Sequence, residues 1–214
     1  MSEAVPLTGE PLALDLVNTR PTAGDLLATP GDLRSWWDLQ ADRLPDEAPQ
    51  EVTAADLAAV HAVREHTARA LDHVRRGDEP LAADLEALNQ AQRAAPAINE
   101  LAWNGSAVAA TRRRDGSPGR RLAAHLAEAA AELLADPAVT NIRECEADDC
   151  VMLFLAAHPR RRWCSAARCG NRMRVARHYQ RHKARQPERS RTLDEQPAVT
   201  DEGICCPGDG DPSP

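Results

Sequence analysis

Aromatic residues and lysine are scarce in this chain of 214 residues. Aromatic side chains make up 3% of the chain, and Lys183 is the only lysine among 26 basic residues. A core with few aromatic rings has to be built from leucine, alanine and valine. Because leucine and alanine are good helix formers and poor strand formers compared with aromatic and β-branched residues, this composition favours packed helices over a large sheet.

Long apolar runs and targeting signals are also missing. The longest uninterrupted apolar run, residues 151–157, is far shorter than the roughly 20 residues that cross a bilayer. The first twenty residues lack the basic region and apolar core of a secretory signal. We therefore expect a cytoplasmic protein with no membrane partner. In that reducing compartment, paired cysteines bind metal more often than they form disulfides.

The net charge is positive in one segment and negative in the rest of the chain. Between Arg160 and Arg191 the chain has 12 Arg or Lys and one acid, a net charge of +11, whereas the rest has 14 basic and 32 acidic residues, or −18. A basic segment in an acidic protein indicates either a polyanionic partner or docking on the protein's own acidic part.

Four of the six cysteines form two C-x4-C pairs, Cys145/Cys150 and Cys164/Cys169. Each pair can lie at the tip of a tight turn, a zinc knuckle, and offer two sulfurs to one ion. Two such pairs have the ligand number of a closed tetrahedral zinc site. Two disulfides, or four unrelated buried cysteines, are the alternatives. The regular spacing and the reducing compartment favour Zn²⁺.

Apolar periodicity predicts a mainly helical N-terminal part. Alternating leucines in residues 11–17 predict a short strand. Thr29 or Asp32 is expected to cap a short helix that carries two tryptophans, at least one of them in the core, and Thr53 to cap a long helix that ends near Gly77. Two more helices are predicted in 80–95 and 121–136.

Two segments in this half and just after it favour β structure. Asn104-Gly105 predicts a hairpin with a two-residue turn, because both residues tolerate positive φ. Residues 139–144 are β-like and lead into the first cysteine pair.

Asp15 lies between two leucines, where an acid is costly unless it is hydrogen-bonded or faces a cavity. With Asn18 and Thr19 it is a candidate for binding an unknown small-molecule ligand. An Asp15 that caps a neighbouring helix or faces solvent is an equally good hypothesis.

A basic helix is predicted directly after the last cysteine. Gly170 permits a tight turn, Asn171 is a preferred N-cap, and an apolar stripe including Met173, Val175 and Tyr179 is expected to pack back on the knuckles. Arg172 is expected to be held by the anionic zinc cluster or by a phosphate, because arginine at a helix start opposes the helix dipole. The candidate nucleic-acid contacts are Arg172, Arg174, Arg177, Arg181 and Arg185. A solvated face is the alternative for these arginines, but few acids balance them.

The segment RRWCSAARCGNRMRVARHYQRH strongly resembles the CGNR-type zinc finger, whose motif is Cys169-Gly170-Asn171-Arg172 here. GEPLALDLVNTR and DLRSWW resemble the start of the ABATE domain, which precedes this finger in the same family. The resemblance implies that the four cysteines bind zinc and that the arginine helix contacts DNA, in a stress-induced bacterial transcription regulator. Residues 156–159, AAHP, depart from the family pattern, in which an Asp and a Ser or Thr are common.

Together these observations predict an α+β protein of three parts. Residues 1–138 form an ABATE-like, mainly helical sensing domain with a few short antiparallel strands, 139–186 a treble-clef-like zinc module, and 187–214 a disordered tail in which Cys205 and Cys206 have no assigned role. We expect a DNA-binding regulator. The alternative is a zinc-stabilised module that binds RNA or an acidic protein. An enzyme is disfavoured because a four-cysteine site has no open position.

Overall fold

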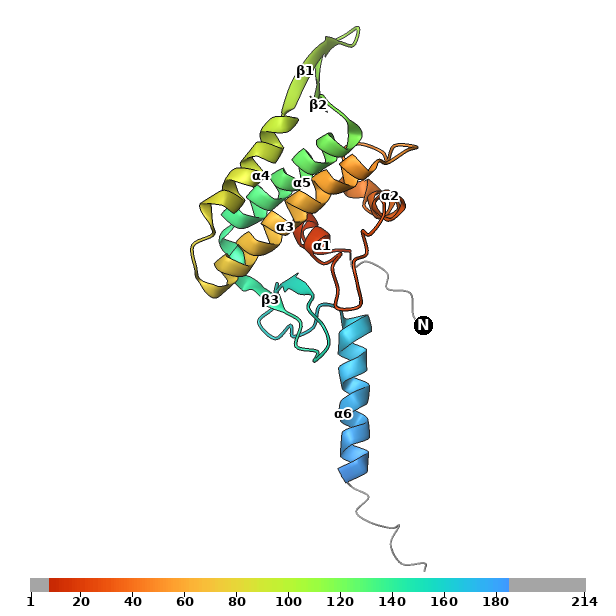
Figure 1. Ribbon diagram of the computed structural model, residues 1–214, viewed down its shortest axis with the longest axis vertical. Coiled ribbons are helices and arrows are strands. Elements are labelled where there is room, and N and C mark those ends of the chain that lie inside the picture. Colours follow the sequence, from red (N-terminus) through yellow and green to blue (C-terminus); the bar gives the residue numbers. More distant parts are fainter. Residues whose placement is uncertain (1–7, 185–214) are drawn as a thin grey trace, which may run out of the picture. The chain divides into compact units, whose positions relative to one another are not determined.

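The computed structural model describes residues 8–184 (Figure 1), which divide at Met173 into two compact units. The predicted tail, with Cys205 and Cys206, lies outside the described residues, and so does Arg185 of the predicted basic helix. Within them, no helix is both long and apolar enough to cross a membrane. The helices are α1 (Leu12–Val17), α2 (Pro30–Leu39), α3 (Ala54–Arg76), α4 (Ala82–Ala94), α5 (Pro118–Ala135) and α6 (Asn171–Ala184). The strands are β1 (Ala97–Trp103), β2 (Val108–Arg114), β3 (Ile142–Glu144) and β4 (Leu153–Leu155), and the short helical turns are η1 (Ala41–Arg43), η2 (Pro137–Asn141) and η3 (Ala166–Gly170).

Three long helices, α3, α4 and α5, lie side by side and form the body of the first unit, and α1 packs against α3 and α5 (Figure 1). Their facing sides carry leucine, valine and alanine at helical spacing, as the composition predicts. Trp36 and Trp37 of α2 are both 1% exposed, so both reach this core. The mainly helical architecture with two antiparallel strand pairs confirms the predicted fold class.

Side-chain caps set where the helices start. Thr29 and Asp32 form a reciprocal capping box at α2, and Thr53 and Asp56 form another at α3. Thr53 is the predicted cap of α3, and of the two candidates at α2 the N-cap is Thr29. Asp56 also accepts a hydrogen bond from the backbone N–H of Gly119 at the start of α5, at 3.1 Å. A Cβ at Gly119 would lie 2.2 Å from Asp56, so only glycine allows this approach of the two helix starts.

The prediction of a strand in residues 11–17 is wrong, because this segment is helix α1. All residues from Leu12 to Leu16 are buried. A segment that is buried on every side has no solvent-exposed face. The alternation of its leucines therefore did not distinguish a strand from a helix.

The hairpin β1–β2 is confirmed, with a register that runs from Ala97↔Arg114 to Trp103↔Val108. Its predicted two-residue turn at Asn104-Gly105 is wrong. Asn104 lies at the start of a longer loop, and its side-chain oxygen accepts hydrogen bonds from the N–H groups of Ser106 and Ala107. The asparagine therefore closes the loop with its side chain, and Gly105 adopts a positive φ of 100°.

A second, shorter hairpin pairs β3 with β4, from Ile142↔Leu155 to Glu144↔Leu153. Ile142 is buried in the main core, and Leu153 and Leu155 pack against that core from its edge. The strands of the predicted zinc module thus share apolar contacts with the helical domain.

Asp15 is the polar centre of the N-terminal segment. Its fully buried carboxylate accepts hydrogen bonds from the backbone N–H groups of Gly9 and Glu10, from Gln40 Nε2 and from Arg43 Nη1. Burial raises the pKa of Asp15 above its ordinary value, although the hydrogen bonds from Arg43, Gly9 and Gln40 oppose this rise. Asp15 therefore joins the chain before α1 to η1.

Replacing Asp15 by alanine should lower the free energy of unfolding by about 1–3 kcal/mol, because several buried donors lose their acceptor. Denaturant unfolding of the variant measures this loss. Asp42→Ala is the matched control: Asp42 is exposed, one residue from Arg43, and its removal should change stability by less than about 0.5 kcal/mol. Equal stability of the two variants would contradict a structural role for Asp15.

Candidate metal centre

The first cysteine pair is built on the β3–β4 hairpin. Cys145 follows β3, and its N–H donates to the carbonyl of Met152, which extends the strand pairing by one step. Cys150 ends a tight turn in which its N–H donates to the carbonyl of Ala147 at 2.9 Å. This is the knuckle that the C-x4-C spacing predicts.

The second cysteine pair is built on η3. Cys164 precedes this turn and Cys169 lies in it, and the Ser165 hydroxyl accepts from the N–H of Arg168 at 3.4 Å. The N–H of Gly170 donates to the carbonyl of Ser165 at 3.0 Å. A Cβ at Gly170 would lie 3.2 Å from the ring of Trp163, so glycine lets the tryptophan close over the turn.

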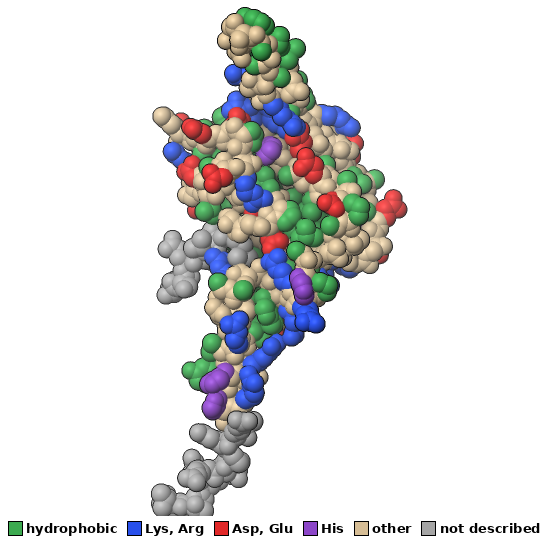
Figure 2. Space-filling view, turned by 180° about the vertical axis from the view of Figure 1, so that it is seen from behind, with side chains coloured by type: hydrophobic (Ala, Val, Ile, Leu, Met, Phe, Trp, Pro, Cys, Tyr) green, Lys and Arg blue, Asp and Glu red, His purple; other side chains and the backbone are tan. Residues whose placement is uncertain are grey.

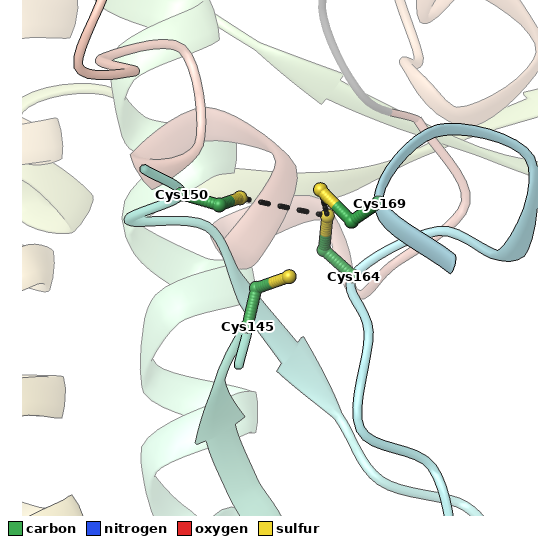
Figure 3. A group of neighbouring side chains, drawn as sticks. All are labelled: Cys145, Cys150, Cys164 and Cys169. Atoms are coloured by element: carbon green, nitrogen blue, oxygen red, sulfur yellow. Dashed lines mark hydrogen bonds between the residues drawn. The ribbon is translucent and has the colours of Figure 1, made fainter. Parts of the chain in front are cut away.

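All four sulfur atoms meet at one point (Figure 3), each within 4.8 Å of the others. Cys150 Sγ is 3.8 Å from Cys164 Sγ, and Cys164 Sγ is 3.6 Å from Cys169 Sγ. Disulfide sulfurs would be about 2.0 Å apart. Sulfurs around a tetrahedral zinc ion, with Zn–S bonds of about 2.3 Å, are separated by about 3.8 Å. The spacing therefore fits ligands of one metal ion and not crosslinks.

Without an ion, the surroundings disfavour ionisation of Cys150 and Cys164. Burial raises the pKa of the Cys150 thiol to about 11. Burial and the neighbouring Cys150 sulfur raise the pKa of Cys164 as well. Four sulfurs this close cannot all be thiolates unless a cation lies among them, and a bound divalent ion deprotonates its thiol ligands.

Arg172, from the start of α6, ties the two cysteine pairs together. Its guanidinium group forms two hydrogen bonds with the carboxylate of Asp149, at 2.8 and 2.6 Å, and Nη2 lies 3.6 Å from Cys169 Sγ. Asp149 belongs to the first knuckle and Cys169 to the second. Arg172 is thus placed beside the thiolates, as expected of an arginine held by an anionic cluster.

The N-terminal domain holds this hairpin through Asn18. The Asn18 amide donates to the carbonyl of Leu153 and accepts from the N–H of the same residue, both at 2.8 Å. A side-chain amide here pairs with β4 as a neighbouring strand would. Next to it, the Glu10 carboxylate accepts from the N–H of Leu155 and forms an ion pair with Arg161.

The three predicted ligand-binding residues do not lie together in one cavity. Asp15 and Thr19 are fully buried. The Thr19 hydroxyl donates to Leu16 and accepts from Arg64, which forms an ion pair with Asp25. Only Asn18 of the three lines a pocket of about 560 Å³ beside the cysteines.

Helix α6 departs from the prediction at its start. Asn171 has helical φ and ψ and is not an N-cap, because η3 leads straight into the helix and Ser165 caps the earlier turn. Met173 packs on the cysteine cluster as expected. Val175 and Tyr179 lie in the second unit and are 54% and 70% exposed, and their packing on the knuckles stays a prediction.

The remaining candidate arginines of α6, Arg174, Arg177 and Arg181, are exposed. Figure 2 shows basic side chains along this helix, while acidic ones lie mainly over the helical domain. Arg181 Nε donates to the carbonyl of Arg177, one turn earlier.

Sequence patterns missed Glu10, Asp149 and Arg161. The pair Glu10–Arg161 joins positions 151 residues apart, and no local signal connects them. Arg161 also donates to the carbonyl of Cys164, and its guanidinium group lies 4.4 Å from the ring centre of Phe154. It therefore links the second cysteine pair to the N-terminal segment.

Comparison with known families gives two matches along the chain. The ABATE family model, described as "putative stress-induced transcription regulator", matches residues 10–137. The CGNR zinc finger model matches residues 141–182. No curated protein matches the chain.

Purified under reducing conditions without chelator, the chain should hold one zinc ion. Replacing Cys145, Cys150, Cys164 or Cys169 singly by serine should leave less than one zinc per chain, because each replacement removes a thiolate ligand. Elemental analysis measures the zinc content. Cys206→Ser is the control and should leave one zinc bound. Protein free of zinc, or a disulfide among the four cysteines, would contradict this prediction.

Asn18→Leu keeps the side-chain size and removes both hydrogen bonds to Leu153, so it should cost about 1–3 kcal/mol of unfolding free energy. Denaturant unfolding of zinc-loaded protein measures this cost. Thr22→Val is the control from the same loop: the exposed Thr22 hydroxyl forms one hydrogen bond, of 3.2 Å, to the carbonyl of Asp149. The expectation fails if Asn18→Leu costs no more than Thr22→Val.

Proposed function

Because the chain belongs to the ABATE family and carries a CGNR zinc finger, we propose that it is a cytoplasmic, zinc-containing transcription regulator that binds DNA through α6 and senses a ligand or partner through its N-terminal domain. The observation that carries the proposal is the position of a basic helix directly after a four-cysteine cluster. Both matched families are of regulatory or zinc-finger type and not enzyme families.

Cys145, Cys150, Cys164 and Cys169 would hold the zinc, and their spacing supports this role. The bound ion would supply the positive charge that keeps four thiolates together and thereby fix the two knuckles. Four protein ligands close the coordination shell, so the site would be structural. Arg172 and Asp149 would hold the knuckles in place around it.

Four of the predicted arginines, Arg174, Arg177 and Arg181 of α6 and Arg185 directly after it in the sequence, would contact the phosphates of duplex DNA. Among residues 171–184 there is no acidic side chain. Arg172 would act differently, because its guanidinium group is already engaged by Asp149 and lies beside the Cys169 sulfur. Phosphate contacts of this kind bind DNA of any sequence and weaken with salt.

The zinc-loaded full chain should bind duplex DNA with a plot of log K against log salt of slope about −3 to −4, from about 0.9 per phosphate contact. Arg177→Ala or Arg181→Ala should reduce the magnitude of the slope by about 1 and weaken all sequences alike. Fluorescence anisotropy at several salt concentrations measures both quantities.

Arg93→Ala removes the same charge from α4, where Arg93 forms an ion pair with Glu86, and should leave the slope unchanged. The proposal fails if zinc-loaded protein shows no salt-dependent DNA binding. It also fails if the protein prefers single-stranded RNA, or an acidic protein, by a wide margin.

A further inference from the structure

The cysteine cluster is not sealed from solvent. A pocket of about 560 Å³ opens on it, and Cys150, Cys164 and Cys169 form part of its wall. This volume is in the range of small-molecule sites and is far larger than a metal ion requires. Structural zinc sites have no chemical need for such an opening, because their four ligands complete the coordination shell.

The wall facing the sulfurs is mostly apolar. It consists of residues from the loop after α1 and from the segment between Cys150 and β4, namely Pro21, Ala23, Leu26, Val151 and Met152. Both sides belong to the first unit, and the Thr22–Asp149 hydrogen bond joins them at the pocket. A small apolar molecule can therefore be desolvated beside the sulfurs.

The charges around the pocket disfavour anions. A divalent ion with four thiolates has a net charge of about −2. Arg172 is neutralised by its pair with Asp149, and Arg168, which also lines the pocket, supplies one further positive charge. The sum stays negative, so an uncharged molecule enters at lower cost than an anion.

One sulfur is more accessible than the others. Cys145, Cys164 and Cys169 are each 6% exposed, whereas Cys150 is only partly buried. Cys150 also follows the tight knuckle turn and directly precedes Val151, which is 53% exposed. A reagent in the pocket thus meets Cys150 first, and the reactivity of a thiolate follows its accessibility.

We propose that this pocket is a sensing site for small uncharged electrophiles of the α,β-unsaturated carbonyl class, and that Cys150 is the sulfur they alkylate. The Cys150 thiolate forms a bond to the β-carbon of the electrophile. The π electron pair moves to the carbonyl as an enolate, which takes a proton from water, so no oxidant is required. The product thioether carries no negative charge, and the cluster loses one of its four anionic ligands.

Alkylation of Cys150 would loosen the first knuckle, which holds Asp149 against Arg172 at the start of α6. Release of zinc follows from the lost ligand. The alkylation requires only the cysteine cluster and the pocket, whereas its effect on DNA binding rests on the function proposed above.

The test uses the zinc-loaded full chain and two maleimides with the same reactive ring, uncharged N-ethylmaleimide and anionic N-(2-carboxyethyl)maleimide. Peptide mass spectrometry locates the first adduct, and a chromogenic chelator follows zinc release. The first adduct in the cluster should be on Cys150, with one zinc released per adduct. After normalisation to the uncharged thiol N-acetylcysteine amide, the anionic reagent should react about tenfold more slowly because of the negative cluster.

Filling the pocket separates its role from ordinary thiol reactivity. Ala23→Trp should slow alkylation of Cys150 about tenfold by blocking access, and Ala28→Trp, an exposed position of the same loop outside the pocket wall, should not. Zinc content and circular dichroism establish first that both variants are folded. Val151→Trp replaces Ala23→Trp if that variant does not fold.

Equal alkylation of the four cysteines, adducts without zinc release, or an Ala23→Trp rate equal to that of the unchanged protein would overturn the proposal. Selective, pocket-dependent alkylation of Cys150 supports it even in a protein that binds no DNA. The DNA titrations described above test the proposed function separately.

Discussion

Four sulfurs within 4.8 Å of one another are the constraint on which the C-terminal part of this structure depends. Their separations of 3.6 and 3.8 Å are too long for covalent bonds and too short for four uncompensated negative charges. A cation among the sulfurs would offset the repulsion between the thiolates. Because the site exists only in the folded chain, the free energy of metal binding would also stabilise the local fold. Around the cluster, the β3–β4 hairpin is only three residues long on each side. Strands this short do not hold a knuckle in place without further support.

Part of that support comes from the N-terminal domain. Asn18 pairs with both backbone groups of Leu153, and Glu10 accepts from Leu155 and pairs with Arg161. The same N-terminal segment is held by Asp15, so Glu10, Asp15 and Asn18 all anchor the nine residues from 10 to 18. The ABATE domain and the zinc finger are therefore joined by these polar contacts and by the apolar core that they share. The hydrogen bond from the Thr22 hydroxyl to the carbonyl of Asp149 also joins the loop after α1 to the first knuckle.

The sequence predicted the features that have a local signature. Thr53 and Thr29 cap helices because a hydroxyl followed by an acid three residues later satisfies the first free N–H groups. The paired cysteines predicted a cluster because four ligands at regular spacing have few other uses. Helix α1 was mistaken for a strand because burial on all sides removes the periodic signal from Leu12–Leu16.

Contacts between distant segments could not be predicted in this way. The sequence indicated that burying Asp15 between two leucines is costly. It did not show that Gln40 and Arg43 donate hydrogen bonds to its carboxylate. Asn18 lines the pocket, and its amide forms two hydrogen bonds with Leu153. These hydrogen bonds could not be predicted from the sequence, because Leu153 of β4 lies far from Asn18 along the chain.

Arg172 shows how one residue reconciles conflicting electrostatic demands. At the first turn of a helix, a positive side chain opposes the partial positive charge of the free N–H groups. Here the Asp149 carboxylate and the Cys169 sulfur lie on the other side of the guanidinium group, and their negative charge outweighs that repulsion over distances of 2.6 to 3.6 Å. The basic character of α6 is therefore not uniform. Its first arginine, Arg172, pairs with Asp149 beside the cysteine cluster, whereas Arg174, Arg177 and Arg181 follow along the exposed helix.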